Sequence, residues 1–352
     1  MPISLGNPFR GQGLGLDAPM PIDQADSVAG LLQHCPAHAE TPLTDMPQLA
    51  AHAGVARLLI KDERARMGLG SFKALGAAHA IAREASAARQ GDDWTHALRG
   101  RVYVTASAGN HGLSVAAGAR LFGAEAVIYL AQTVPEAFAE RLRAKGARVV
   151  RAGATYEASM EAAEAAARDN GWTLLSDSSW PGYIDLPLRV MEGYLQLAAE
   201  AAAQWGQKCD APPSHILLQA GVGGLAAAVA AQARAHWGDA PQIIVVEPAA
   251  APALFESIRA GHLVTAEGPV SAMGRLDCKT PSMIALNGLA RDADLFVTIT
   301  ESEAARAVAL LAEHGMATTP SGAAGVAAVV TGLGLGPDAR VLAYVSEGPE
   351  RG

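Results

Sequence analysis

One lysine stands among small and apolar residues in the segment GLGSFKALGAAHA, residues 68–80. No acidic residue lies within this segment, and burial disfavours an ammonium ion, so we expect a lowered pKa for Lys73 and a neutral amine able to form a Schiff base. If a helix begins just before it, Gly76, Ala77 and Ala80 share its face. Those small residues leave room for a flat group or for another helix. Most lysines are solvated surface charges, so the hypothesis depends on the neighbouring loops.

A second segment, TASAGNHGLSVA at residues 105–116, is expected to join a strand to a helix. It combines small hydrogen-bond donors with an amide and an imidazole. Backbone N–H groups at a helix start, together with a serine hydroxyl, suit a carboxylate, although a solvated loop has a similar composition. The candidate residues are Ser107, Gly109, Asn110, His111 and Gly112.

A third segment, LLQAGVGGLAAAVAAQARAHW at residues 217–237, runs from an apolar strand through three glycines into an alanine-rich helix. Such a turn directs N–H groups at an anion, and a phosphate is the natural ligand. The same letters fit the looser dinucleotide pattern GxGxxA, with Glu247 placed where an acid would meet a ribose. A tight turn without a ligand is the third interpretation.

The elements that position these loops follow an α/β pattern from about residue 100 onward. A long helical stretch, residues 188–206, separates two series of strands. Thr300 to Glu303 forms a capping-box pattern, and Gly315 marks the end of that helix. The predicted strands are 101–106, 124–130, 147–152 and 172–176 in the first series, and 214–220, 241–248, 294–300 and 340–348 in the second.

Composition excludes several classes of protein. The 352 residues carry a net charge of -8 and no basic run interleaved with aromatics, which argues against nucleic acid as a partner. No apolar stretch is long enough for a bilayer, and the first residues lack a signal-peptide pattern. The three cysteines are far apart, so neither a disulfide framework nor a metal site is expected. A cytoplasmic protein fits these features.

Together, the three loops resemble those of the fold-type II pyridoxal-phosphate (PLP) enzymes, in the order found in that group. Within it the sequence is most similar to diaminopropionate ammonia-lyases. The similarity spans residues 40 to 348, and GRLDCK and WPGY are fairly specific to the subfamily. The segments that carry the resemblance are KDERARMGLGSFKALGAAHA, GNHG, DSSWPGY, MEGY, SAMGRLDCKTPS and SEGP.

The resemblance implies a role for each loop. Lys73 would bind the cofactor covalently, Asn110 would hydrogen-bond its phenolic oxygen, and Ser346 would meet its pyridine nitrogen, with Glu347 a less favoured candidate. The phosphate loop would be Gly221, Val222, Gly223, Gly224 and Leu225. The implied architecture is a large PLP-binding domain from residues 1–80 and 183–352, a small substrate-carboxylate domain from 81–182, and a homodimer.

Position 108 departs from the family pattern. Diaminopropionate ammonia-lyases generally have an aspartate there, assigned as the base for the D-substrate, and this chain has Ala108. The second acid is kept as Asp177. We therefore expect α,β-elimination on L-2,3-diaminopropionate through Lys73 and Asp177, to pyruvate and ammonia, with weak or no activity on the D-isomer. The alternatives are a serine, threonine or 3-hydroxy amino acid dehydratase, an NAD-dependent dehydrogenase, and a non-catalytic amino-acid sensor.

Overall fold

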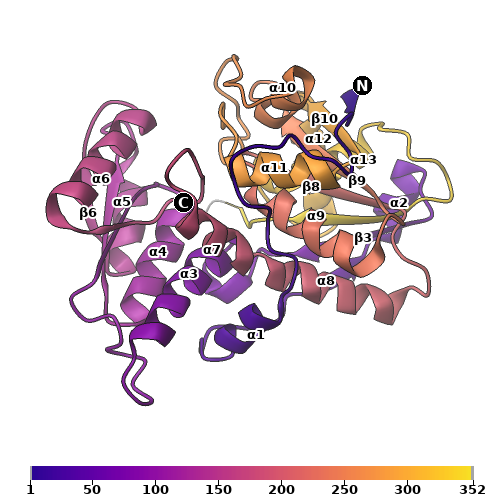
Figure 1. Cartoon of the computed structure of the whole chain (residues 1–352). Coiled ribbons are helices and arrows are strands. Elements are labelled where there is room, and N and C mark those ends of the chain that lie inside the picture. The colour runs from indigo at the N-terminus through magenta and orange to yellow at the C-terminus, as the bar shows by residue number, and fades with distance from the viewer. Residues whose placement is uncertain (1, 350–352) are drawn as a thin grey trace.

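Two sheets organise the protein, which is described here from a computed structural model covering residues 2–349 (Figure 1). The larger sheet has seven strands in the order β1-β10-β9-β8-β11-β3-β2, and the smaller has four in the order β6-β5-β4-β7. All neighbouring strands are parallel except β1 and β2, which are antiparallel at the two edges of the larger sheet. The strands are β1 Ile3–Gly6, β2 Leu43–Asp45, β3 Arg57–Asp62, β4 Val102–Ala106, β5 Glu125–Leu130, β6 Arg148–Arg151, β7 Thr173–Leu174, β8 His215–Gln219, β9 Gln242–Pro248, β10 Leu295–Ile299 and β11 Arg340–Val345.

Helices cover both faces of the larger sheet, because its central strands are apolar on both sides. On β8, Leu217 packs into one core cluster while its neighbours Ile216 and Leu218 pack into another. This is the near-continuous apolar pattern of a buried parallel sheet. The helices are α1 Asp26–Leu32, α2 Pro47–Ala53, α3 Lys73–Ala88, α4 Asn110–Leu121, α5 Glu136–Ala144, α6 Tyr156–Asn170, α7 Asp185–Gly193, α8 Leu195–Lys208, α9 Gly224–Trp237, α10 Ala253–Ala260, α11 Met283–Asp292, α12 Glu301–Glu313 and α13 Pro320–Val330, with a short 3₁₀ turn at Arg66–Gly68.

The predicted α/β class is confirmed, and every strand predicted after residue 100 forms. The capping box at Thr300 is present, with the Glu303 side chain returning to the Thr300 backbone. The prediction of one helix over residues 188–206 is wrong, because α7 ends at Gly193 and α8 begins at Leu195. Tyr194, the one residue between the two helices, keeps helical backbone angles of φ -72° and ψ -14°, so the two helices follow each other closely. A Cβ atom on Gly193 would lie 2.6 Å from the Leu75 carbonyl oxygen, so this glycine permits the close contact with α3.

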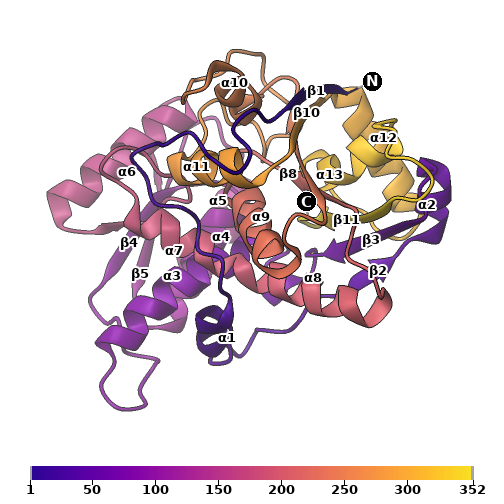
Figure 2. The ribbon, with the colours of Figure 1, turned by 45° about the vertical axis from the view of Figure 1, so that its right-hand side comes forward.

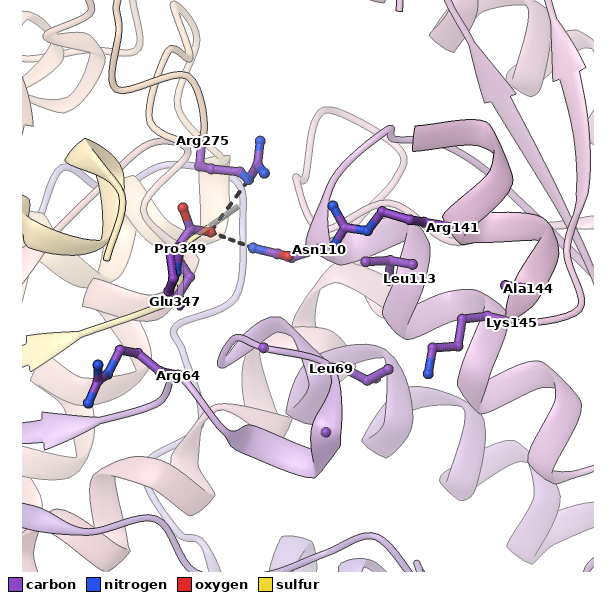
Figure 3. A pocket seen from close by; sticks show the side chains of 13 residues that line it. Arg64, Leu69, Asn110, Leu113, Arg141, Ala144, Lys145, Arg275, Glu347 and Pro349 are labelled. Atoms are coloured by element: carbon purple, nitrogen blue, oxygen red, sulfur yellow. Dashed lines mark hydrogen bonds and ion pairs between the residues drawn. The ribbon is translucent and has the colours of Figure 1, made fainter. Parts of the chain in front are cut away.

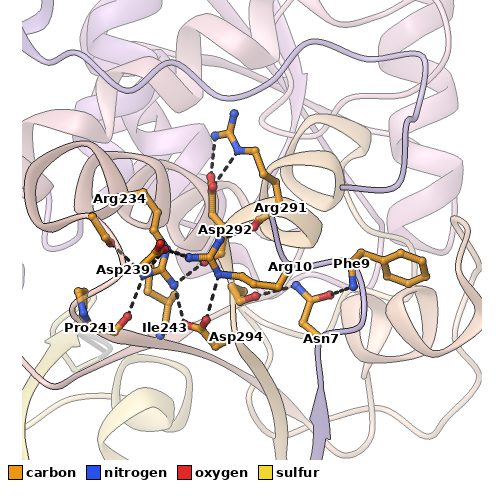
Figure 4. A network of polar contacts seen from close by, with 12 residues as sticks. Asn7, Phe9, Arg10, Arg234, Asp239, Pro241, Ile243, Arg291, Asp292 and Asp294 are labelled. Carbon is orange, nitrogen blue, oxygen red and sulfur yellow. Dashed lines mark hydrogen bonds and ion pairs between the residues drawn. The ribbon is translucent and has the colours of Figure 1, made fainter. Parts of the chain in front are cut away.

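The first residues of the described chain attach to the edge of the larger sheet (Figure 4). After β1, the Asn7 side chain donates to the carbonyl oxygens of Ala290 at 2.8 Å and Ala293 at 2.6 Å, at the end of α11. The Arg10 guanidinium pairs with Asp294 at 3.0 Å and with Asp239. These contacts satisfy carbonyl groups at the helix end and hold the segment after β1, which pairs with β10 and forms the edge of the sheet.

Helix α3 connects the two sheets. It begins after the 3₁₀ turn beside the larger sheet and packs against α4 of the smaller unit and against α7 (Figure 2). It therefore runs through residue 80, where the resemblance predicts a domain boundary, without interruption. The division at residues 80 and 182 stays a prediction, while the strands of the smaller sheet come from residues 102–174.

No helix within residues 2–349 has both the length and the apolar character needed to cross a bilayer. The same part of the chain contains no cluster of three or more His, Cys, Asp or Glu side chains arranged to hold a metal ion.

Candidate active site

Lys73 occupies the first position of α3, and the end of β11 holds the turn before it. The N–H of Phe72 donates to the carbonyl oxygen of Ser346 at 3.1 Å, and the N–H of Gly348 donates to Gly70 at 2.9 Å. Two segments far apart in the chain thus form a short backbone pairing beside the lysine. The position of its amine is set by the last strand of the sheet as well as by its own helix.

The Lys73 ammonium forms an ion pair with Asp177, which follows β7 in the smaller unit. Both side chains are about four-fifths buried, with 21% and 19% exposure. Burial alone would lower the pKa of Lys73, but the charge of Asp177 outweighs it and holds that pKa above its usual value. Burial alone would raise the pKa of Asp177, and Lys73 holds it well below its usual range. The prediction of an unpaired lysine with a lowered pKa is therefore wrong.

The space beside Lys73 is filled from α7 and its neighbours. A Cβ atom on Gly76 would lie 2.6 Å from a ring carbon of Tyr194 and 2.7 Å from Val190, so this glycine admits a neighbouring helix rather than a flat ligand. The second alternative left open by the small residues is the one that the structure adopts. The Tyr194 hydroxyl is buried and has no hydrogen-bond partner within residues 2–349. Burial raises its pKa, so it stays protonated and can donate.

The loop before α4 brings its N–H groups together as expected. Gly109 is the residue before the helix, and its N–H donates to the Ser107 hydroxyl oxygen at 3.3 Å. A Cβ atom on Gly112 would lie 2.3 Å from the Ser107 carbonyl oxygen, so only glycine permits this tight turn. The helix start therefore presents backbone donors to an anion.

The imidazole of His111 serves a different purpose from the backbone donors. It is buried, and its Nε2 lies 2.8 Å from the carbonyl oxygen of Leu175. Burial lowers the pKa of His111, so the ring is neutral and donates from Nε2. The ring links the loop to β7, and only the backbone N–H of this residue is left to contact a carboxylate.

The glycine turn after β8 also has the geometry of an anion site. Gly223 has φ +98°, in the left-handed region, and α9 begins at the next residue. A Cβ atom on Gly221 would lie 3.1 Å from Cys278 Sγ and 3.1 Å from Leu276 Cα. The segment GRLDCK thus packs directly against the turn. The first N–H groups of α9, in a turn without side-chain bulk, match what a phosphate requires.

The dinucleotide interpretation fails at Glu247. Its two carboxylate oxygens accept the N–H groups of Leu254 and Phe255, each at 2.7 Å, and cap α10. The side chain is completely buried, and burial raises its pKa to about 8. Because both carboxylate oxygens of Glu247 already accept backbone hydrogen bonds, this side chain cannot bind a ribose.

Ser346 lies at the end of β11, at the same edge of the sheet as the glycine turn. Its N–H donates to Gly322 at 3.4 Å and its carbonyl oxygen accepts from Phe72, so the backbone on both sides is fixed. Within residues 2–349 its hydroxyl makes no hydrogen bond with the protein, which leaves it free for a ligand.

A cavity of about 400 Å³ adjoins the Asn110 loop (Figure 3). Asn110 Nδ2 donates to Glu347, and the Nε of Arg275 lies 3.4 Å from the same carboxylate. Neither Lys73 nor Asp177 lines this cavity. The position of the reacting centre is therefore defined by the Lys73–Asp177 ion pair and not by the cavity. The lining residues are Arg64, Gly68, Leu69, Gly70, Asn110, Leu113, Arg141, Ala144, Lys145, Arg275, Glu347, Gly348 and Pro349.

The sequence analysis missed two tyrosines near the pair, Tyr194 and Tyr156. Burial, followed by the charge of Asp177, raises the pKa of Tyr156, although 55% of the residue is exposed. The segment MEGY contained Tyr194, but nothing in the spacing placed either residue beside Lys73.

The residues at this site have the features that binding of PLP requires. The Gly221 to Leu225 turn offers backbone donors where Cβ atoms would collide, and the buried Tyr194 hydroxyl lacks a protein partner. The Lys73 amine pairs with Asp177 of the smaller unit, and the Ser346 hydroxyl follows β11, which neighbours the strand that leads into the glycine turn. Together the fold and the site define a fold-type II PLP enzyme.

Comparisons with known proteins agree. Residues 35–347 match the model of the "Pyridoxal-phosphate dependent enzyme" family. Diaminopropionate ammonia-lyase from Salmonella typhimurium is 32% identical over 314 residues, covering 83% of this chain and 78% of that protein. Human L-serine dehydratase/L-threonine deaminase is 31% identical over 275 residues, covering 78% and 76%. The crystal structure of holo diaminopropionate ammonia-lyase from Escherichia coli superposes with a TM-score of 0.87 at 28% identity, covering 99% of this chain and 94% of that one.

The chain belongs to the pyridoxal-phosphate dependent enzyme family. It is a PLP-dependent ammonia-lyase, a carbon–nitrogen lyase.

Proposed function

We propose that this enzyme eliminates the β-amino group of L-2,3-diaminopropionate and acts weakly or not at all on the D-isomer. The observation that supports it is the pairing of Lys73 with Asp177 in a loop system where position 108 is alanine. Similarity to diaminopropionate ammonia-lyases over most of the chain favours this substrate. The predicted homodimer and cytoplasmic location belong to the same proposal and rest on the resemblance and on cysteine usage.

Specific residues would hold the cofactor. Lys73 would carry it, and the turn from Gly221 to Leu225 would bind its phosphate. The Asn110 amide would donate to its phenolic oxygen, and the Ser346 hydroxyl would meet its pyridine nitrogen. When bound, PLP withdraws electrons from the α-carbon of the substrate. A hydroxyl at the pyridine nitrogen makes it a weaker electron sink than a carboxylate would, which suits elimination.

The protein's own groups would bind and orient the substrate. Its carboxylate would accept hydrogen bonds from the N–H groups at the start of α4 and from the Ser107 hydroxyl. The neutral, buried His111 adds no charge there, so the helix start and its N–H groups supply the attraction. In this pose the α-carbon would lie toward the ion pair that joins the two units.

The ion pair would then move the protons. Asp177 is held as a carboxylate and Lys73 as an ammonium, so one member can accept the α-proton while the other donates to the leaving amine. The α-C–H and β-C–N bonds break, a carbon–carbon double bond forms, and ammonia leaves. Water hydrolyses the released enamine to pyruvate and a second ammonia, which balances the atoms.

A serine or threonine dehydratase is the second candidate. Alanine at 108 removes a carboxylate that would favour a positively charged β-amino group, so a hydroxyl leaving group becomes a competitor. The similarity to human L-serine dehydratase/L-threonine deaminase is consistent with it.

Visible absorption and ammonia release by the PLP-loaded protein test the proposal. L-2,3-diaminopropionate is expected to shift the visible band and release ammonia with a higher kcat/KM than L-serine or L-threonine, and the D-isomer is expected to release little. A higher kcat/KM for L-serine would replace the first candidate by the second. A band that shifts without turnover of any amino acid would indicate the sensor alternative.

A further inference from the structure

The residue after Ser346 joins three segments of the site. Glu347 forms an isolated antiparallel bridge with Ser71, immediately before the lysine turn. Its carbonyl oxygen accepts the hydroxyl of Thr318 at 2.5 Å. The backbone at this position is therefore fixed against the turn that carries Lys73.

The side chain of Glu347 is also fixed, with only 4% of the residue exposed. Oε1 accepts the hydroxyl of Thr319, which caps α13. Oε2 accepts Nδ2 of Asn110 (Figure 3). Arg275 Nε faces Oε2 at 3.4 Å. A Cβ atom on Gly322 would lie 3.1 Å from Glu347 Cγ, so a glycine makes room for the carboxylate. Both oxygens are occupied by groups of the protein.

This contact determines how the Asn110 amide is turned. An ionised carboxylate only accepts hydrogen bonds, so the donor end of the amide must face Glu347 and the acceptor end must face away. The amide is planar, so fixing one N–H of Nδ2 also fixes the direction of the other. Asn110 begins α4 in the smaller unit and Glu347 follows β11 in the larger sheet, so the contact joins the two units.

We propose that Glu347 is a positioning residue that holds the Asn110 carboxamide with its second N–H toward the phenolic oxygen of PLP. It acts through Asn110 and does not serve the pyridine nitrogen. This inference rests on the placement of Asn110 in the proposed function.

The test measures the pH midpoint of the visible band of the PLP-loaded protein without substrate. Glu347→Ala and Asn110→Ala are each expected to shift that midpoint in the same direction by about one unit, the effect of losing one hydrogen bond to a charged atom. Because the two residues act in one chain of contacts, the double variant is expected to show the shift of a single variant. Additive shifts would overturn the proposal and assign Glu347 an independent role.

Glu347→Gln separates orientation from charge. A glutamine oxygen can still accept from Asn110 while its amide nitrogen faces the Thr319 hydroxyl, so this variant is expected to keep the wild-type midpoint. If the pH midpoint of Glu347→Gln shifts as far as that of Asn110→Ala, the proposal is overturned. This measurement can still be made if Glu347→Ala does not fold. Glu313→Gln, an exposed acid on α12, is the control. The band is read without any amino acid, so a wrong substrate assignment would not affect this result.

Discussion

The ion pair between Lys73 and Asp177 sets the charge state from which this enzyme must react. An amine has to lose its proton before it can bond to the aldehyde of PLP, and Asp177 opposes that loss. The sequence could not predict this, because Asp177 is 104 residues away and follows a strand of the other sheet. Lys73 is buried, and burial alone would lower its pKa. The single negative charge of Asp177 outweighs that effect and raises the pKa instead.

Replacing Asp177 by Asn is therefore expected to ease cofactor uptake while it impairs turnover. The raised pKa of Lys73 depends on the carboxylate, so without it burial dominates and the pKa falls. The amine then becomes neutral at lower pH. The pH at which the apoprotein takes up PLP, followed by visible absorbance, is expected to move to lower pH. Asp185→Asn, on the exposed start of α7, is the control. An unchanged uptake profile would contradict this account.

Ala108 leads to a prediction about stereochemistry. An aspartate at this position in the loop before α4 is expected to raise turnover of D-2,3-diaminopropionate toward the ~10²-fold that a positioned base contributes. Turnover of the L-isomer, which uses Lys73 and Asp177, is expected to change much less. Ammonia release from each isomer by the wild type and Ala108→Asp measures the ratio. No gain with the D-isomer would show that residue 108 is not what distinguishes this chain from its relatives.

At the scale of elements, the packing of α3 against α7 depends on Gly76. Gly76→Ala would place a methyl group 2.6 Å from the buried ring of Tyr194, and we expect a loss of about 1–3 kcal/mol in the free energy of unfolding. Gly206→Ala in α8 meets nothing within 4 Å and is expected to stabilise by about 0.5–1 kcal/mol. Denaturant unfolding of both variants provides the comparison. Equal effects would mean that the helix contact is looser than described.

The elements after residue 100 were predictable because their strands are short apolar runs between alanine-rich helices. The turns at Asn110 and Gly221 were predictable because each is a run of small residues between an apolar strand and a helix. The strands β1, β2 and β3 were not predicted. Three or four residues at a sheet edge, as in β1 and β2, carry little pattern. Strand β3 has six residues, and its apolar run Leu58 to Ile60 is too short to define a strand without its neighbours. The close contact of Gly193 with α3 and the roles of Tyr194 and Glu347 depend on contacts between distant segments, which no local pattern contains.

At the scale of the whole molecule, a buried ionic cluster joins β3 to α8 just before the lysine turn. Glu200 accepts from Lys61 at 2.8 Å and from Arg66 at 2.6 Å, and Arg66 also pairs with Glu63 at 2.8 Å. All four side chains are at most 4% exposed. Removing one partner of such a cluster leaves charge buried without compensation.

Glu200→Gln is expected to destabilise the protein by about 3–5 kcal/mol at neutral pH. Burial alone would raise the pKa of Glu200, but hydrogen bonds from Arg66 and the nearby positive charges lower it to about 2. A carboxyl with a lowered folded-state pKa stabilises above its unfolded value of 4.5, and that contribution, at most about 3 kcal/mol, is lost as the pH falls toward 2. The variant is therefore expected to show a smaller slope of unfolding free energy between pH 4.5 and 3. Glu313→Gln keeping the wild-type slope is the control, and an equal slope in Glu200→Gln would contradict the assignment.

The place of β11 in the larger sheet has a consequence for synthesis on the ribosome. This last strand lies between β8 and β3, so the centre of the sheet stays open until residues 340–345 have emerged. The strands of the smaller sheet come from one continuous stretch and can pair much earlier. Long-range pairing is slow, and an unfilled sheet exposes apolar edges while it waits. From this strand order we expect the smaller unit to be able to form before the larger sheet, which needs the strand that also completes the active site.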